Sequence, residues 1–114
     1  MIKDFVLKFK KQEMGVGRRK KATARVFFQY GTGNLVINNI RGKKYLQDNL
    51  IYFNKILEPL KTFKKEKIFD IIALVNGGGL VSQTTAIQLG VSKLLFKIYP
   101  ENKGFLKKKG FLTQ

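Results

Sequence analysis

The sequence contains no cysteine, no histidine and no tryptophan, and it has only two prolines among its 114 residues. The absence of cysteine excludes disulfides and thiolate chemistry, and the absence of histidine removes the commonest general base and metal ligand. The seven acidic residues lie singly along the chain, without the pairing that acid–base catalysis or hard-cation binding requires. We therefore expect neither an enzyme nor a protein with a cofactor or metal.

Long apolar runs are also absent, since no stretch reaches the roughly 18 residues that a membrane-spanning helix needs. Positive charge is abundant instead: 23 Lys and Arg oppose 7 Asp and Glu, which gives a formal net charge of +16 at pH 7. Such a chain repels itself and indicates a polyanionic partner, either nucleic acid or an anionic membrane surface. The dominance of Lys over Arg, with frequent Ile, Asn and Phe, suggests an AT-rich genome such as that of an organelle.

Hydrophobic patterning predicts a basic N-terminal arm over residues 1–14 and one α+β domain over residues 15–114. For the arm, a membrane-surface helix is the alternative. In the domain, period-two alternation over 22–30 predicts a strand, and the turn residues at 31–34 predict a hairpin to a second strand. The nearly continuous apolar run at 68–75 predicts an interior strand.

Two helices are predicted by apolar residues spaced three and four apart. The first starts near Leu46, and Pro59 should stop or kink it near Leu57. The second runs for about 16 residues, with Ser82 as a possible cap and Pro100 just beyond its end. We expect a small mixed sheet with the helices on one face.

Three segments carry features of nucleic-acid binding. The first, GVGRRKKATARV, is predicted to be a glycine-containing loop with four consecutive cations that enters a strand, although a solvated charge run is the alternative. The second, NGGGLVSQTTA, places glycines at a helix N-terminus, where backbone N–H groups attract anions. It matches neither nucleotide-binding glycine motif, and glycine needed only for a tight turn is an equal alternative.

The third segment, KGFLKKKGFLTQ, interleaves lysines with aromatic residues that could meet phosphates and bases together. The alternative is that Phe and Leu pack on the core while the lysines face water. In either case the lysines remain candidates for phosphate contacts.

In this order the motifs resemble the family of the ninth protein of the small ribosomal subunit, in its bacterial and organellar form. The stretch GVGRRKKATARVF is similar to the family signature Gly-x-Gly-Arg-Arg-Lys-x-x-x-Ala-Arg-Val, and GTGNLVINN to its first hairpin. The glycine loop with its long helix and the late basic segment also match, so the resemblance covers residues 15–113. It implies the fold of the second domain of ribosomal protein five, which contains a left-handed β-α-β crossover.

The resemblance implies a structural protein that binds rRNA in the head of the small subunit beside other head proteins, in a plastid rather than a mitochondrion, or else in a bacterium. A basic nucleic-acid chaperone outside the ribosome is the alternative, and a phosphoryl-transfer enzyme is a third hypothesis that the missing loop lysine disfavours. With Arg41 added at the end of the predicted hairpin, the expected rRNA contacts are Arg18, Arg19, Lys20, Lys21, Arg41, Gly77, Gly78, Gly79, Ser82, Gln83, Lys107, Lys108 and Lys109.

One departure from the family concerns the C-terminal end. Family members continue into a long basic tail that reaches toward the tRNA in the peptidyl site, whereas this sequence stops at Gln114. We expect a truncated sequence, and a contact with tRNA is assigned to no residue present.

Overall fold

The computed structural model describes residues 14–100, so that the predicted arm, apart from Met14, lies outside the described residues. Five strands form one sheet in the order β1-β2-β5-β3-β4. Their bounds are β1 Gly15–Arg19, β2 Ala22–Tyr30, β3 Leu35–Ile37, β4 Ile40–Arg41 and β5 Phe69–Asn76. Only β3 and β5 pair in parallel, and the other three pairings are antiparallel, so the sheet is mixed as predicted.

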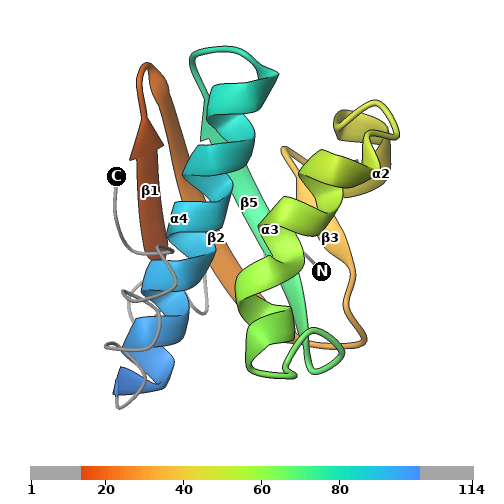
Figure 1. The fold of residues 1–114 in the computed structure, drawn as a ribbon, viewed down its shortest axis with the longest axis vertical. Coiled ribbons are helices and arrows are strands. Elements are labelled where there is room, and N and C mark those ends of the chain that lie inside the picture. The colour runs from red at the N-terminus through yellow and green to blue at the C-terminus, as the bar shows by residue number, and fades with distance from the viewer. Residues whose placement is uncertain (1–13, 101–114) are drawn as a thin grey trace.

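Three helices complete the described fold: α2 Gly42–Tyr45, α3 Leu50–Thr62 and α4 Leu80–Ile98. The two long helices, α3 and α4, cover one face of the sheet, which confirms the predicted α+β architecture (Figure 1). Between helices and sheet lies one main core, to which β2 contributes Ala24 and Val26, β5 contributes Ile71, and α4 contributes Ile87 and Leu94. The predicted interior strand is β5, which has a partner on each side.

The predicted hairpin between β2 and the strand that follows it is wrong. Strand β5 lies between β2 and β3, and the segment 31–34 crosses the end of β5 instead of forming a tight turn. The carboxylate of Asp70 holds this crossing, because its Oδ1 accepts hydrogen bonds from the N–H groups of Thr32, Gly33 and Asn34 at 3.1, 2.9 and 2.8 Å. The hairpin partner of β3 is β4, through a turn in which Asn38 and Asn39 both have positive φ.

The connection from β3 through α3 to β5 is left-handed. In Figure 1 both strands run upward, β3 lies to the right of β5, and α3 lies in front of them. Parallel strands are joined with the opposite hand in nearly all proteins. The rare hand is the one that the family resemblance implied.

Helix α3 differs from its prediction at both ends. It begins at Leu50, where the side chain of Asn49 accepts a hydrogen bond from the N–H of Tyr52, and it continues past Pro59 to Thr62. A proline inside a helix leaves the carbonyl four residues earlier without its usual donor. Here that carbonyl, of Lys55, accepts a hydrogen bond of 2.9 Å from Nε2 of Gln88 on α4, so the helix tolerates Pro59.

Helix α4 begins earlier than predicted and is 19 residues long. Gly79 is its N-cap residue, and Ser82 lies inside the first turn, so Ser82 is not the cap. The helix ends at Ile98, two residues before Pro100, as the sequence predicted.

Candidate nucleic-acid interface

The first cationic motif forms a strand and a turn, so the prediction of an entry loop is wrong. Residues 15–19 are β1, which pairs with β2 from Gly15 opposite Val26 to Arg19 opposite Ala22, and Lys20 and Lys21 form the turn of this hairpin. A non-glycine residue with positive φ is uncommon, yet Lys20 has a φ of 54°. The sheet therefore includes residues 15–19, which precede the strand predicted over 22–30.

Four consecutive cations, residues 18–21, occupy this hairpin tip, and all four are exposed. Within the described residues their side chains have no hydrogen-bond or ion-pair partner. Adjacent residues of a strand point to opposite faces, so Arg18 and Arg19 are directed to opposite sides of the hairpin. The hairpin tip therefore presents positive charge on both faces, and its four cations are not gathered on one face.

The two glycines of the motif pack against a helix. A Cβ atom on Gly15 would overlap the carbonyl oxygen of Gly90, and one on Gly17 would overlap that of Ala86, both on α4. The sequence did not predict that these glycines approach α4. These glycines let β1 lie directly on the helix and so fix where the hairpin tip stands.

The second predicted motif lies beside the hairpin tip. Strand β2 pairs with β5 up to Thr23 opposite Asn76, so the loop 77–79 emerges next to Lys21, whose carbonyl oxygen a Cβ on Gly77 would overlap. Gly77 and Gly78 have φ values of 80° and 68°, which favour glycine. The N–H groups of residues 77–79 donate no hydrogen bond to any other described residue.

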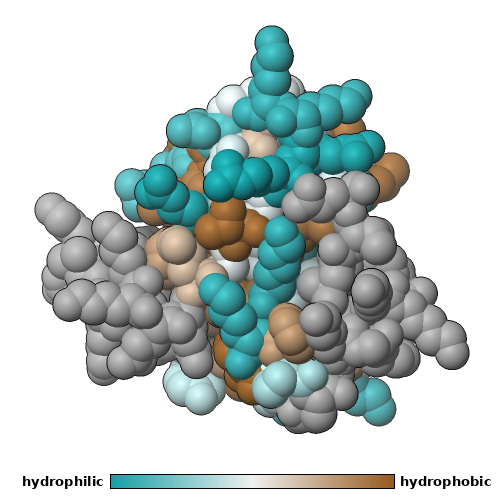
Figure 2. All heavy atoms as spheres, turned by 90° about the vertical axis from the view of Figure 1, so that its left-hand side faces the viewer, coloured by the Kyte–Doolittle hydropathy of each residue, from teal (hydrophilic) through white to brown (hydrophobic). Residues whose placement is uncertain are grey.

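Charge and open N–H groups thus gather at one end of the molecule. In Figure 1 the β1–β2 turn and the loop before α4 lie together at the top. Figure 2 shows hydrophilic side chains concentrated at the same upper end of the face that carries β1. Because α4 begins here, the positive end of its dipole adds to the four cations.

The predicted contact residue Gln83 uses its side chain within the protein. Its Nε2 donates a hydrogen bond of 3.1 Å to the carbonyl of Gly77, and its Oε1 accepts one of 2.8 Å from the hydroxyl of Tyr45. Asn38 continues the network, since its Nδ2 lies 3.5 Å from the hydroxyl of Tyr45. The side chain of Asn38 also accepts a hydrogen bond from the N–H of Val75 and donates one to the carbonyl of the same residue. Sequence patterns did not point to Tyr45 or Asn38 as supports of the glycine loop.

Two other predicted contacts are not part of this end. Arg41 is exposed at the end of β4, at the opposite edge of the sheet from β1. Lys107, Lys108 and Lys109 lie outside the described residues.

Other classes of site find no support in the part of the chain that the structure describes. Residues 14–100 contain no group of three or more side chains that could hold a metal ion. Likewise, none of the described helices combines the length and the apolar character that crossing a bilayer requires. The exposed cations at the hairpin tip remain the most distinctive chemical feature.

Comparison with known proteins gives consistent matches. The family model described as ribosomal protein S9/S16 matches residues 17–114. The small ribosomal subunit protein uS9c of Phaeodactylum tricornutum is 51% identical over 106 residues, which cover 93% of this chain and 77% of that protein. The uS9 protein of Thermosynechococcus vestitus is 45% identical over 101 residues, 89% of this chain and 74% of that protein. The uS9c protein of Arabidopsis thaliana is 44% identical over 101 residues, 89% of this chain and 49% of that protein.

Proposed function

Because this chain belongs to the ribosomal protein S9/S16 family, we propose that it binds rRNA through the hairpin tip and the glycine loop described above. The chain is a structural constituent of the small ribosomal subunit, and its plastid-type and cyanobacterial relatives place it in the plastid ribosome. A basic chaperone that works outside the ribosome is thereby disfavoured. We assign the protein no catalytic role, since the family is a structural one.

The observation that carries the proposal is the juxtaposition of the hairpin tip, residues 18–21, with the loop 77–79. Arg side chains bind phosphate oxygens through a planar fork, and Lys side chains act as mobile point charges. Free backbone N–H groups at a helix N-terminus bind the same oxygens. The end of the sheet therefore suits a folded RNA backbone, which such proteins recognise by shape and charge more than by sequence.

The predicted contacts divide into two roles in this proposal. Arg18, Arg19, Lys20 and Lys21 touch phosphates directly, whereas Gln83 holds the loop in place from behind. Residues 107–109 would add a further basic contact, and the head of the subunit, with its neighbouring proteins, would be the location. A role toward tRNA is assigned to no described residue.

The test replaces Arg18, Arg19, Lys20 and Lys21 together by Gln and measures binding to small-subunit rRNA over a range of salt concentrations. The slope of log K against log salt should fall by about 0.7 to 0.9 for each phosphate that the variant no longer binds. Association with the small subunit in sedimentation should weaken in parallel.

A matched control neutralises four lysines between the end of α3 and the start of β5, Lys61, Lys64, Lys65 and Lys67, with the same change in net charge. This connection lies at the bottom of Figure 1, away from the β1–β2 turn. The control should keep most of the salt slope. Equal decreases in both variants would mean that only net charge matters and would contradict the proposed interface.

A further inference from the structure

Three aromatic rings stack at the end of β2 that lies furthest from the hairpin tip, at the bottom of Figure 1. The ring centre of Phe69 lies 4.9 Å from that of Phe28 and 5.4 Å from that of Tyr30, and the ring planes meet at 25° and 26°. Phe28 and Phe69 are buried in the main core, whereas the side chain of Tyr30 is 77% exposed. The stack therefore starts in the core and ends at the surface with Tyr30.

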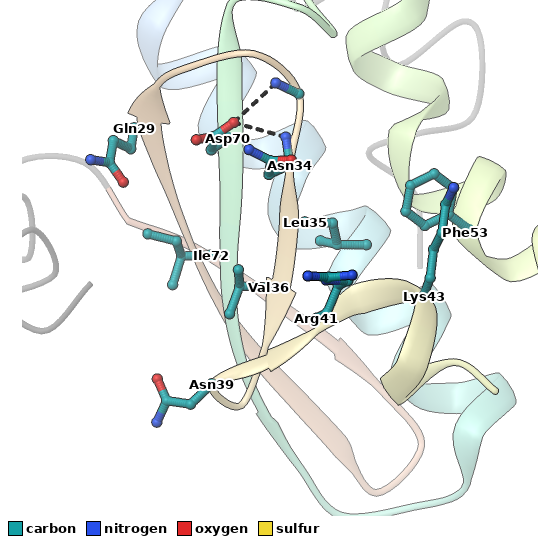
Figure 3. A pocket seen from close by; sticks show the side chains of 11 residues that line it. Gln29, Asn34, Leu35, Val36, Asn39, Arg41, Lys43, Phe53, Asp70 and Ile72 are labelled. Carbon is teal, nitrogen blue, oxygen red and sulfur yellow. Dashed lines mark hydrogen bonds between the residues drawn. The ribbon is translucent and has the colours of Figure 1, made fainter. Parts of the chain in front are cut away.

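The backbone that carries Tyr30 is fixed on both sides of the residue. Tyr30 is the last residue of β2 and pairs with Phe69, the first residue of β5, so their side chains stand side by side on one face of the sheet. Directly after it, the N–H of Gly31 donates a hydrogen bond of 2.8 Å to the carbonyl of Ile68. The carboxylate of Asp70 then holds residues 32–34, and Figure 3 shows hydrogen bonds from this backbone to Asp70. The ring of Tyr30 is thus presented by a well-anchored strand end.

One side of the Tyr30 ring has no partner in the part of the chain that the structure describes. Among residues 14–100 the ring stacks on that of Phe69 alone, and its hydroxyl forms no hydrogen bond. Because Phe69 lies against one side, the high exposure of Tyr30 comes from the rest of the ring. A ring that is supported on one side and open on the other is a surface on which a second flat ring stacks.

The surroundings of this ring favour an anionic partner. Lys67 is exposed and without a partner among the described residues, and its Cα lies 3.8 Å from the position that a Cβ on Gly33 would occupy, beside the segment that follows Tyr30. Of the two carboxylates nearby, Asp70 already accepts three backbone N–H groups, and Oε1 of Glu66 is buried. An anionic chain that carries flat rings therefore matches both the charge and the exposed ring.

We propose that Tyr30 is a stacking platform for one unpaired base of rRNA. The inference rests on the proposed function, because rRNA is the polyanion that the protein meets. RNA-binding proteins commonly hold single-stranded bases by stacking them on aromatic side chains. Strand β2 has nine residues, so at about 3.4 Å per residue the platform lies roughly 27 Å from the start of the strand at the hairpin tip. Strand β2 thus carries a charged contact at one end and a stacking contact at the other.

The two contacts differ in their response to salt. The salt slope of RNA binding comes from phosphates that protein cations neutralise, whereas stacking involves the face of a base. The stacking platform therefore raises affinity while most of the salt slope stays with the hairpin tip.

The direct test is an NMR titration of the full chain with hexaadenylate RNA and, as a polyanion without bases, with inorganic polyphosphate. The ring protons of Tyr30 should shift upfield with the RNA and not with polyphosphate, whereas the amide signals of residues 18–21 should shift with both. Binding at the platform is followed at the amide of Gly31 in two variants. Tyr30→Leu should weaken it about tenfold, and Tyr30→Phe, which keeps the ring, should stay within about twofold of the wild type. Tyr30 protons that do not move with RNA, or equal binding by the two variants, would overturn the proposal.

A second test uses reconstituted small subunits and chemical probing of the rRNA. One base that is protected by the wild type should become reactive with Tyr30→Leu and stay protected with Tyr30→Phe. Ile51→Ala is the matched control, because it truncates an apolar side chain that is also 77% exposed, and it should leave that base protected.

The outcomes of this second test separate the two proposals. If the wild-type chain does not join the subunit, the proposed function fails. If it joins and Tyr30→Leu changes the reactivity of no base, the stacking platform alone is refuted. Loss of a neighbouring protein from the Tyr30→Leu subunit without a newly reactive base would identify a protein as the occupant and would also refute the platform.

Discussion

Strand β5 is flanked by two glycine-containing loops that differ in the source of the anion for their N–H groups. Beside the first residues of the strand, the loop 31–34 surrounds the carboxylate of Asp70, which accepts hydrogen bonds from three backbone N–H groups. After the strand, the loop 77–79 lies beside four unpaired cations, and its N–H groups bind no described acceptor. The first loop is complete within the chain, whereas the second has donors and charge available for an external anion.

The difference shows how one backbone feature serves two purposes. A cluster of N–H groups attracts an anion wherever it occurs. When the chain supplies that anion, the result is structural, as in the crossing of β5 by residues 31–34. When the chain supplies only further positive charge, the result is a surface suited to a polyanion.

The largest expected effect comes from Gly17→Ala, which disturbs the packing of β1 on α4 below the open end of the molecule, that is, the hairpin tip 18–21 and the loop 77–79. The new methyl would overlap the carbonyl oxygen of Ala86, so β1 must move away from α4. We expect a loss of about 2 to 3 kcal/mol in the free energy of unfolding, typical of overpacking at a close approach. Gly79→Ala is the control, because no atom lies within 4 Å of its new methyl. Chemical denaturation of both variants measures the difference, and equal destabilisation would contradict the packing role of Gly17.

The next effect comes from Asp70→Ala, which turns the filled loop into an open one. Three N–H groups lose their acceptor, and we expect the free energy of unfolding to fall by about 1 to 3 kcal/mol, limited by water that can replace the carboxylate. Added sulfate should restore part of this stability in thermal unfolding. The control Glu58→Ala removes the same charge from an exposed position on α3. Its free energy of unfolding should match that of the wild type, and added sulfate should not restore any stability. A variant as stable as the wild type would show that the carboxylate does not hold the loop.

Local patterns in the sequence predicted most of the elements that these two loops connect. Alternation identified β2, the apolar run identified the interior strand β5, and helical spacing identified α4. The helices on one face and the mixed sheet followed from the order of these elements. Each of these features depends on residues near one another in the chain, which is why periodicity sufficed.

Long-range pairing could not be predicted in this way. The turn residues at 31–34 have the composition of a hairpin, but β5 inserts between β2 and β3, and the residue that stabilises the crossing is Asp70, far along the chain. Pro59 was expected to stop or kink α3 near Leu57, and the amide that compensates for it belongs to Gln88 on another helix. The motif at 15–21 was predicted as a loop from its glycines and consecutive cations. Its glycines instead allow β1 to pack on α4, a helix far along the chain.

A smaller effect is expected from Gln83→Leu, which removes the side chain that ties the open loop to α2. The variant lacks the bond to the carbonyl of Gly77 and the bond from the hydroxyl of Tyr45, and we expect it to be less stable by about 1 kcal/mol. Backbone ¹⁵N order parameters of residues 77–79 should fall more than those of residues 32–34. Tyr45→Phe keeps the bond to Gly77 and should leave the order parameters of the loop nearly unchanged. Equal order parameters in all three proteins would mean that Gln83 does not position the loop.

The smallest effect on stability is expected from Lys20→Gly, and its sign is the informative part. Lys20 has a φ of 54°, a conformation that costs a residue with a Cβ roughly 1 to 2 kcal/mol and that glycine adopts freely. Because glycine also gains freedom in the unfolded chain, we expect the variant to be more stable by at most about 1 kcal/mol. Binding to rRNA should nevertheless weaken, since one cation is removed from the hairpin tip.

Lys21→Gly is the control for this last comparison, because Lys21 is not among the residues with positive φ. It should bind rRNA with a similarly reduced affinity but without the gain in stability. Thermal unfolding and a salt titration of RNA binding measure the two quantities separately. A gain in stability together with weaker binding would mean that the fold tolerates a strained lysine at the tip for the sake of its charge. If Lys20→Gly changed stability alone, the lysine at this position would not contact RNA, and the open end would depend on Arg18, Arg19 and Lys21.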